Sequence, residues 1–258
     1  MMRRSSSDKW IAAVSVLGIL LLSLGLRWLY QELNPLIGRD DSLYCHIAVV
    51  WSGTGDFRCA YREYIGGTAP LYIYLLKLGV DCGIPVVTWG RILAFCFSGA
   101  FVFAFYLLGR QLFPGRHDAA LICMFLAGLH PVIGRMSVAL AREGPFVALA
   151  AFALVFWARA FRTGGAWSAA VCGLLLGAAV MTRHEALELL FLGAAGLLPW
   201  PGGDASAGGK GLVARFRQVL LLLSGAGLAV VLILVLAGIP VSFLIHQYLP
   251  KLYGVRLA

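Results

Sequence analysis

Hydrophobic residues occur in long, almost uninterrupted runs along this chain, and short polar segments separate the runs. A helix needs about 20 apolar residues to cross the hydrocarbon core of a bilayer. Length and apolarity predict seven spans, at residues 10–30, 89–112, 119–134, 145–161, 166–182, 186–200 and 219–239. A further run, residues 69–80, is too short to cross and predicts an interfacial or re-entrant helix. The pattern therefore predicts an all-α polytopic membrane protein.

Composition supports the same class. The chain is 60% hydrophobic and 13% charged, with a mean hydropathy of +0.86, which excludes an ordinary soluble domain. A net charge of +9 would suggest nucleic-acid binding in a soluble protein. Here the positive-inside rule explains it without a nucleic-acid partner, since a cytoplasmic N-terminus puts ten of the 21 basic but three of the 12 acidic residues inside. We therefore expect a multi-pass protein of the plasma (inner) membrane.

The most polar stretch lies in the first outer connection, residues 31–87, where Asp40 and Asp41 closely follow the first span. The apolar residues that follow recur at helical spacing: Leu43, Ile47, Val50 and Trp51. This spacing predicts an amphipathic helix on the membrane surface. The two acids would occupy its first turn, where the helix dipole favours negative charge. Carboxylates at a membrane face are functional candidates. The simpler alternative is that Asp40 only caps this helix.

Two further outer segments supply charged groups. The segment "RMSVALAREGPF" brings Arg142 and Glu143 to the start of the fourth span. The segment "MTRHEALELL" places Arg183, His184 and Glu185 between two spans that are so close that the turn must lie at membrane depth. A permanently charged guanidinium at that depth needs an anion. Because most acidic residues fall on the outer side, we expect an extracytoplasmic active site.

These groups fit the transfer of a sugar from a lipid phosphate to an acceptor. Such a reaction needs a carboxylate to take the acceptor proton and cations to hold the departing phosphate. Asp40 is predicted to be the base, and Arg183 is predicted to bind the phosphate, with Arg142 as a weaker candidate for the same task. Asp41 and Glu143 could orient Asp40, contact the sugar, or hold a divalent cation with it.

Four residues complete the set of candidates. Tyr44, His184 and Glu185 are candidate substrate-binding residues because they adjoin the predicted base or the predicted phosphate binder. For His184, a structural hydrogen bond remains the simpler alternative. Arg91 opens the second span, where its side chain either extends to the membrane surface or turns inward to the phosphate.

Other features predict structure rather than chemistry. The cytoplasmic Gly-rich segment 201–211 is predicted to be a flexible linker. Small residues in "GGAWSAAVCGLLLGAAV" predict close helix packing. The six cysteines form no CxxC or Cys/His cluster, so no metal site is predicted from them. Pairing of Cys45 with Cys59 in an oxidising compartment stays open.

The order of these segments resembles the polytopic glycosyltransferases of the C-type fold, which include the protein O-mannosyltransferases and the bacterial transferases that add aminoarabinose to lipid A. The segment "RDDSLYCHIA" is similar to the acidic element of that family's first outer loop, with Asp41 where the family has Glu. The likeness continues through "GTAPLYIYLLKLG" and "GLLLGAAVMTRHEAL". The resemblance implies a sugar donor on polyprenyl phosphate, an inverted linkage, and Asp40 as the base that activates the acceptor.

The resemblance leaves alternatives open. Relatives usually continue with more spans, so a single module of residues 1–258 is expected to be C-terminally short: a minimal enzyme, one completed by a membrane protein partner, or an inactive form. A non-catalytic assembly subunit is the main rival, and a transporter or lipid scramblase is a weaker one. The sugar is not identified, and neither is the acceptor, which could be an envelope lipid, a glycan or a protein.

Overall fold

The computed structural model describes residues 6–33, 38–61, 70–198 and 209–242, and all of its regular elements there are helices. They are α1 (Ser6–Leu33), α2 (Arg39–Thr54), α3 (Phe57–Tyr61), α4 (Pro70–Asp81), α5 (Val86–Leu112), α6 (His117–Leu129), α7 (Pro131–Val138), α8 (Glu143–Thr163), α9 (Ala166–Val180), α10 (Ala186–Leu197) and α11 (Gly209–Ala237). The predicted all-α class is confirmed.

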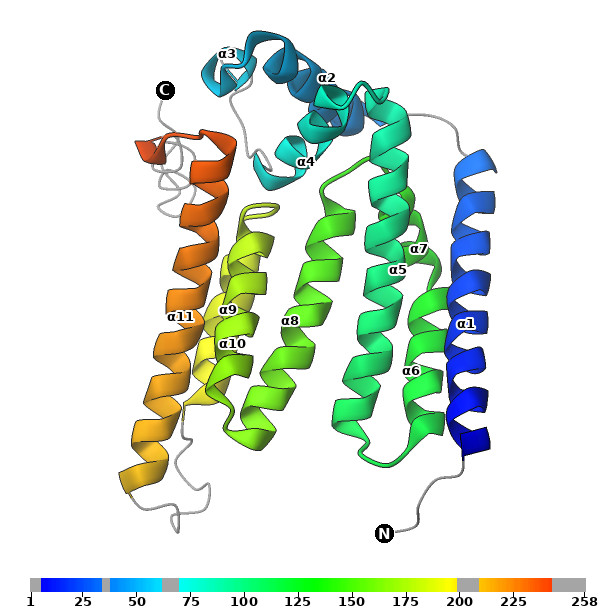
Figure 1. Cartoon of the computed structure of the whole chain (residues 1–258), viewed down its shortest axis with the longest axis vertical. Helices are drawn as coiled ribbons and strands as arrows, with labels where there is room; N and C mark the ends of the chain where they lie inside the picture. Colours follow the sequence, from blue (N-terminus) through cyan, green and yellow to red (C-terminus); the bar gives the residue numbers. More distant parts are fainter. Residues whose placement is uncertain (1–5, 34–37, 62–69, 199–208, 243–258) are drawn as a thin grey trace.

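The long helices stand side by side in a bundle, and α2, α3 and α4 lie together across one end of it (Figure 1). The N-terminus lies at the opposite end of the bundle, where the connections between α5 and α6 and between α8 and α9 also lie. The end that carries α2 to α4 is called the capped end below. It also holds the short turn between α9 and α10 and the start of α8.

Four helices are long and apolar enough to cross a membrane: Trp10–Leu33, Val86–Leu112, Glu143–Thr163 and Leu212–Ala237. They correspond to the first, second, fourth and seventh predicted spans. The other three predicted spans coincide with shorter apolar helices, His117–Leu129, Ala166–Val180 and Ala186–Leu197. The structure therefore shows a multi-span membrane protein, and the full count of seven stays a prediction.

The shorter helices end early for local reasons. The run predicted at 119–134 is broken at His130, which leaves α6 and caps α7 by accepting from the Ile133 N–H at 3.3 Å. Pro131 causes the break, because proline has no N–H to continue α6 but suits the first turn of a new helix. At the other end of the described chain, α11 begins at Gly209, inside the linker predicted at 201–211. Residues 201–208 of that linker lie outside the described residues.

The predicted amphipathic helix is α2, and its apolar face is covered by protein. Ile47 and Trp51 are buried against Ile73 and Leu76 of α4, in a cluster that also contains Leu234 at the end of α11. Helix α4 is the short helix predicted at 69–80. It is tied to the bundle by two hydrogen bonds, from Leu71 N to Met181 O at 3.1 Å and from Trp89 Nε1 to Leu75 O at 2.8 Å.

Small residues bring α9 and α11 together, as the sequence predicted. A Cβ atom added to Gly173 would overlap the backbone of Leu222, and one added to Gly177 would overlap the backbone of Ala226. In a membrane the hydrophobic effect does not hold helices together, because lipid tails are as apolar as leucine. Close packing of this kind stabilises the helix pair instead.

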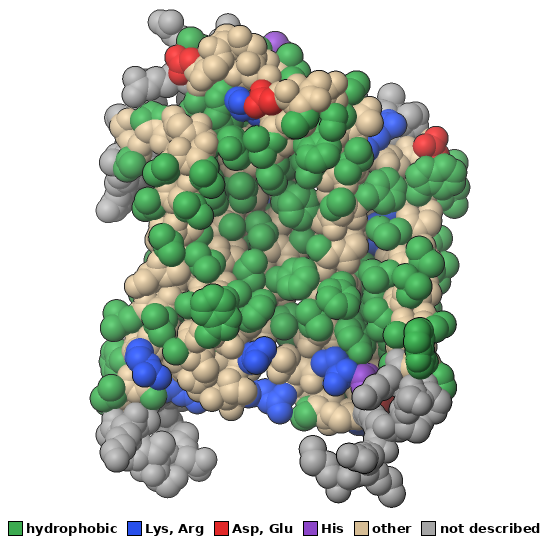
Figure 2. All heavy atoms as spheres, in the orientation of Figure 1, with side chains coloured by type: hydrophobic (Ala, Val, Ile, Leu, Met, Phe, Trp, Pro, Cys, Tyr) green, Lys and Arg blue, Asp and Glu red, His purple; other side chains and the backbone are tan. Residues whose placement is uncertain are grey.

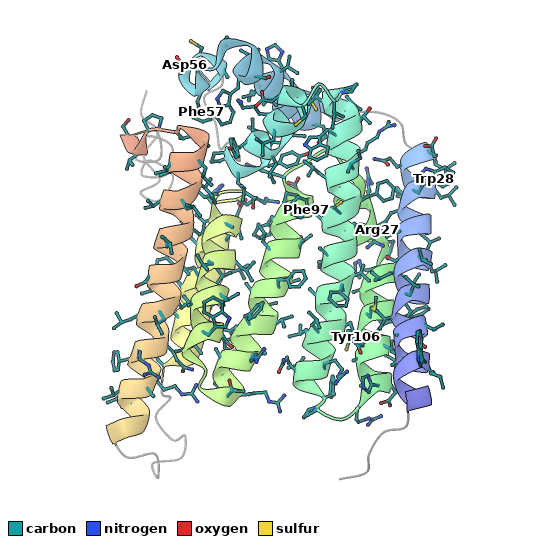
Figure 3. All side chains as sticks on the ribbon, viewed as in Figure 1. Arg27, Trp28, Asp56, Phe57, Phe97 and Tyr106 are labelled. Atoms are coloured by element: carbon teal, nitrogen blue, oxygen red, sulfur yellow. The ribbon has the colours of Figure 1, made fainter. Side chains whose placement is uncertain are left out.

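Charge is distributed unevenly between the two ends of the bundle. On the face shown in Figure 2, basic side chains gather at the end opposite the cap, and acidic side chains lie toward the capped end. The basic groups there join neighbouring helices: Arg162 donates to Gln111 O, and Arg215 donates to Phe161 O. Arg27 is an exception within a span, since it is buried between α1 and α6 and donates to Gly128 O at 2.9 Å (Figure 3).

Candidate active site

Arg183 is the centre of a charged cluster at the capped end. It lies in the turn between α9 and α10, and its side chain is 25% exposed. One edge of the guanidinium donates two parallel hydrogen bonds to Glu185, from Nη2 at 2.8 Å and from Nε at 3.2 Å. The Nη1 atom donates to Glu143, the first residue of α8, at 3.1 Å. The arginine thus joins the start of α8 to the start of α10.

The electrostatics of the cluster follow from these bonds. The hydrogen bond from Arg183 lowers the pKa of Glu185 to about 2. The same bond raises the pKa of Arg183 above its already high value. The Arg183 guanidinium carbon lies 5.7 Å from the centre of the Phe146 ring, which adds a cation–π contact. The Arg183 guanidinium and the Glu185 carboxylate are therefore both fully charged at neutral pH.

Two more predicted residues lie at the edges of the cluster. Arg142 Nε is 4.0 Å from Glu143 Oε1, and His184 Nδ1 is 3.5 Å from Glu185 Oε2. The structure therefore brings together Arg142, Glu143, Arg183, His184 and Glu185, which come from two segments 40 residues apart in the sequence. The sequence left open whether Arg183 and Glu143 lie together, and the structure joins them by a hydrogen bond.

Asp41, in the first turn of α2, lies close enough to this cluster for the charge of Glu143 to act on it. Its carboxylate accepts from the Gly38 N–H at 3.2 Å, so the capping role weighed for Asp40 belongs to Asp41. Burial raises the pKa of Asp41 above its usual value, against the favourable Gly38 N–H, and the negative charges of Glu143 and Asp40 raise it further. The first outer segment and the cluster therefore share one electrostatic environment.

The predicted base, Asp40, is exposed. It is close enough for its charge to raise the pKa of Asp41 and of Tyr44. No ion pair between Asp40 and an arginine is present among the residues whose side chains the structure describes. Arg91 is half-buried on α5, and within the same described part of the chain it forms no ion pair with this cluster.

Two tyrosines lie beneath Asp41. Tyr44 is buried, and burial raises its pKa, while the positive charge of Arg142 acts in the opposite direction. The ring of Tyr72 meets the ring of Tyr44 edge-on at 5.9 Å. Tyr72 is 1% exposed, and within the described part of the chain its hydroxyl has no hydrogen-bond partner. The packing of α2 on α4 buries this ring.

The metal alternative and the cysteine pairing can also be compared with the structure. Among the described residues, no group of three or more His, Cys, Asp or Glu side chains is arranged to hold a metal ion. The set Asp40, Asp41 and Glu143 thus receives no support as a cation site. Cys45 is buried with a free thiol, so the structure does not pair it with the exposed Cys59.

Sequence reasoning missed two residues of this site. Phe146 lies three residues after Glu143, and the helical spacing of that pair was a usable signal for its position beneath Arg183. The hydroxyl of Tyr72 had no such signal. Its position depends on the packing of α2 on α4, and a sequence pattern does not report which side chains of two helices meet.

The fold and the cluster define a multi-span membrane protein with a charged site, built around an arginine and several carboxylates, at one end of its helix bundle. Residues 68–202 match the family described as dolichyl-phosphate-mannose-protein mannosyltransferase. The chain belongs to this family, whose members are membrane glycosyltransferases that use a lipid-phosphate-linked sugar. The matched region includes Arg142, Glu143 and Arg183 and begins after Asp40 and Asp41. A comparison with curated proteins found no match.

Proposed function

We propose that this protein transfers a sugar from polyprenyl phosphate to a hydroxyl acceptor on the extracytoplasmic face of the membrane, with inversion at the anomeric carbon. The sugar in its family is mannose. The observation that carries the proposal is the bond between Arg183 and Glu143 at the capped end, with Asp41 close enough for the charge of Glu143 to act on it. The proposal also includes seven spans and a cytoplasmic N-terminus. The basic side chains at the end of the bundle opposite the capped end support this orientation.

In the proposed reaction, the Asp40 carboxylate takes the proton of the acceptor hydroxyl as its oxygen attacks the anomeric carbon. The bond between that carbon and the phosphate oxygen breaks, and its electron pair leaves with the polyprenyl phosphate. The role of Asp40 rests on the likeness of its segment to the acidic element of the family's first outer loop, and its exposure leaves it accessible to an acceptor. Asp41, which is half-buried and held by the Gly38 N–H, is better suited to position the start of α2.

Arg183 is the proposed phosphate binder, and Arg142 the second cation beside it. The Arg183 edge that holds Glu185 has the two-donor geometry that also fits a phosphate. Glu185 is 38% exposed, so its carboxylate has room to move away when phosphate binds. Glu185, Glu143, His184 and Tyr44 are then proposed to contact the sugar. Arg91 is proposed only as an additional contact to the phosphate, at the outer edge of the site.

Asp40 is tested by measuring sugar transfer in membranes that contain the Asp40→Asn variant. Loss of a general base lowers the rate by about 10²- to 10⁴-fold. The matched control is Asp56→Asn, another exposed aspartate on the elements at the capped end. The control should retain the wild-type rate, and equal transfer by Asp40→Asn and wild type would remove Asp40 from catalysis.

Arg183 is tested by donor binding. Arg183→Ala should weaken binding of a polyprenyl-phosphate sugar by more than tenfold, since a charge-assisted bidentate contact is lost. Arg135→Ala is the control, because Arg135 is exposed on α7. An Arg183→Ala protein that is well expressed and binds donor normally would contradict the assignment.

The acceptor class is the least determined part of the proposal. The family name specifies a protein acceptor, so peptides with free hydroxyl groups are the first to be assayed, followed by envelope lipids and glycans. The same transfer assay, repeated with a metal chelator, tests whether a divalent metal takes part. If wild type transfers no sugar with any donor and acceptor, a non-catalytic subunit or an enzyme completed by a membrane partner replaces the proposal.

A further inference from the structure

The Tyr72 hydroxyl is a buried polar group that neither the fold nor the proposed mechanism uses. Tyr72 is 1% exposed, and no described residue forms a hydrogen bond with its hydroxyl. Buried polar groups in native proteins almost always have a partner, and one that has none lowers stability. Phenylalanine would fill the same space without this cost. The packing of α2 on α4 therefore gives no reason for a tyrosine here, and the hydroxyl indicates a ligand that supplies its partner.

Tyr72 adjoins both the first turn of α2 and the turn between α9 and α10. Asp41 and Tyr44 are three residues apart on α2, so they lie on one face of that helix. The Tyr44 ring meets the Tyr72 ring edge-on at 5.9 Å. At the residue before Tyr72, Leu71 N donates to Met181 O at 3.1 Å, two residues before the proposed phosphate binder. The hydroxyl therefore belongs to a residue held by both elements of the candidate site.

The surroundings of the hydroxyl are acidic. Burial raises the pKa of Tyr72 well above its usual value, and the negative charges of Asp41 and Glu143 raise it further. The hydroxyl is therefore protonated at neutral pH and can donate a hydrogen bond. The two carboxylates repel a phosphate, whereas a sugar hydroxyl can accept from the tyrosine and donate to a carboxylate. The chemistry beside Tyr72 thus favours a sugar over a phosphate.

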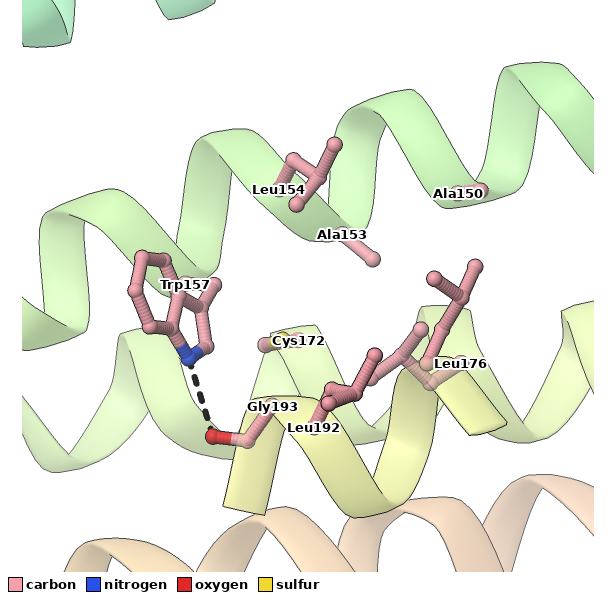
Figure 4. Close-up of a pocket in the computed structure, with 9 residues that line it drawn as sticks. Ala150, Ala153, Leu154, Trp157, Cys172, Leu176, Leu192 and Gly193 are labelled. Atoms are coloured by element: carbon pink, nitrogen blue, oxygen red, sulfur yellow. Dashed lines mark hydrogen bonds between the residues drawn. The ribbon is translucent and has the colours of Figure 1, made fainter. Parts of the chain in front are cut away.

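The cavity between α8, α9 and α10 is a poorer place for a sugar. Its volume is about 270 Å³, and its lining side chains are aliphatic apart from Trp157 and the Cys172 thiol (Figure 4). The indole N–H is already used, because Trp157 Nε1 donates to Gly193 O at 2.9 Å. A sugar in this cavity would leave most of its hydroxyl groups without partners, which costs free energy. The polar groups at the capped end are the better match.

We propose that the Tyr72 hydroxyl binds the sugar of the lipid-linked donor and that the Tyr44 ring moves aside to admit it. The inference rests on the proposed function, because it takes Arg183 as the site of the donor phosphate. Tyr44 is 5% exposed and contacts Tyr72, so an incoming sugar has to displace its ring. Tyr44 is also close enough to Arg183 to interact with it electrostatically. The phosphate would thus lie at the arginine and the attached sugar above Tyr72.

The first experiment compares Tyr72→Phe with wild type in donor kinetics and in thermal unfolding without donor. Loss of a hydrogen bond to the sugar should raise the KM of the donor by about threefold to tenfold. The melting temperature should equal or exceed that of wild type, because a buried hydroxyl without a partner is removed. Tyr74→Phe is the matched control, since Tyr74 is half-buried on α4 with its ring 5.8 Å from Trp51. The control should keep the wild-type KM.

The second experiment uses donors that each lack one hydroxyl group of the sugar, with mannose, the sugar in the family name, as the parent. In wild type, one of these deletions should raise the KM as much as Tyr72→Phe does. In Tyr72→Phe the same deletion should have no further effect, because its partner is already gone. Deletions at the other positions should act equally in both proteins.

The outcomes separate the inference from the function on which it rests. Transfer by wild type with an unchanged donor KM in Tyr72→Phe, or additive effects of every deletion, overturns the inference and leaves the function standing. A rise only in the KM of the acceptor also overturns it, because Tyr72 would then bind the acceptor. Absence of transfer by wild type, together with donor binding that Tyr72→Phe weakens and Tyr74→Phe does not, refutes the function and supports the sugar site.

Discussion

At the scale of single residues, the site depends on how Arg183 is shared between two carboxylates. Glu143 fixes the arginine to α8, and Glu185 holds its other edge. A half-buried guanidinium with two such partners is stable in an apolar region, since removing either partner leaves charge uncompensated. The same arrangement keeps the arginine extended toward the capped end, where a phosphate could replace one carboxylate.

Glu185 predicts a specific pH dependence of stability. Its pKa in the folded protein is about 2, below the usual value of 4.5. A lowered pKa means that its contribution is fully present above pH 4.5 and is lost as the pH falls toward 2. The difference in melting temperature between wild type and Glu185→Gln should therefore be constant from pH 8 to pH 5 and shrink below that range.

Thermal unfolding in detergent micelles measures this difference. Glu188→Gln is a suitable control, because Glu188 is exposed one turn further along α10 and should show little effect at any of these pH values. A wild-type advantage over Glu185→Gln that already disappears between pH 8 and pH 5 would contradict the pairing with Arg183.

At the scale of elements, the sequence predicted the existence of most helices but not all of their ends. Hydrophobic runs located α1, α5 and α8 to within four residues at each end, because length and apolarity alone define a span, whereas α11 begins ten residues before its predicted span. The break between α6 and α7 was missed although Pro131 was visible, since proline can also kink a continuous membrane helix. The burial of α2 on α4 was not predictable, because an amphipathic pattern does not say whether protein or lipid covers the apolar face.

The close contact of α9 with α11 gives the second prediction. Gly173→Ala should destabilise the protein by about 1–3 kcal/mol, because the added methyl group meets the backbone of Leu222 and neither helix can move freely away. Gly227→Ala is the control on α11, since no atom lies within 4 Å of the added methyl group.

Unfolding free energies of the two variants check this prediction. In Gly227→Ala the intrinsic helix preference should act alone and stabilise by about 0.5–1 kcal/mol. Equal effects of the two substitutions would show that α9 and α11 do not depend on this close approach.

At the scale of the whole molecule, the order of segments predicted that Glu143 and Arg183 lie on the same side of the membrane, and the structure joins them across a gap of 40 residues. Topology places the turns that follow alternate spans at one end of a bundle, so the outer segments had to be near one another. Side-chain direction was not available from that argument. Topology predicted Asp40 and Asp41 in the same region, but not that Asp41 is half-buried while Asp40 remains exposed.

Membrane orientation gives the third prediction. Cys82 is exposed at the turn between α4 and α5, and Asp118 is exposed at the opposite end of the bundle, at the start of α6. In an otherwise cysteine-free protein, a membrane-impermeant maleimide should label Cys82 in intact cells. A cysteine introduced by Asp118→Cys should react only after the membrane is permeabilised. The reverse pattern would place the charged cluster in the cytoplasm.

The two carboxylate contacts of Arg183 also bear on how the protein is made. Synthesis proceeds from the N-terminus, so α8 and Glu143 leave the ribosome before the α9–α10 hairpin does. Helices of 15 and 12 residues are too short to be stable membrane insertions by themselves. When the α9–α10 hairpin inserts, its Arg183 side chain can bind Glu143, which has already been synthesised. We therefore expect insertion of α9 and α10 to depend on α8, so that a Glu143→Gln chain is inserted poorly and degraded faster than wild type, which a pulse-chase measurement in cells would show.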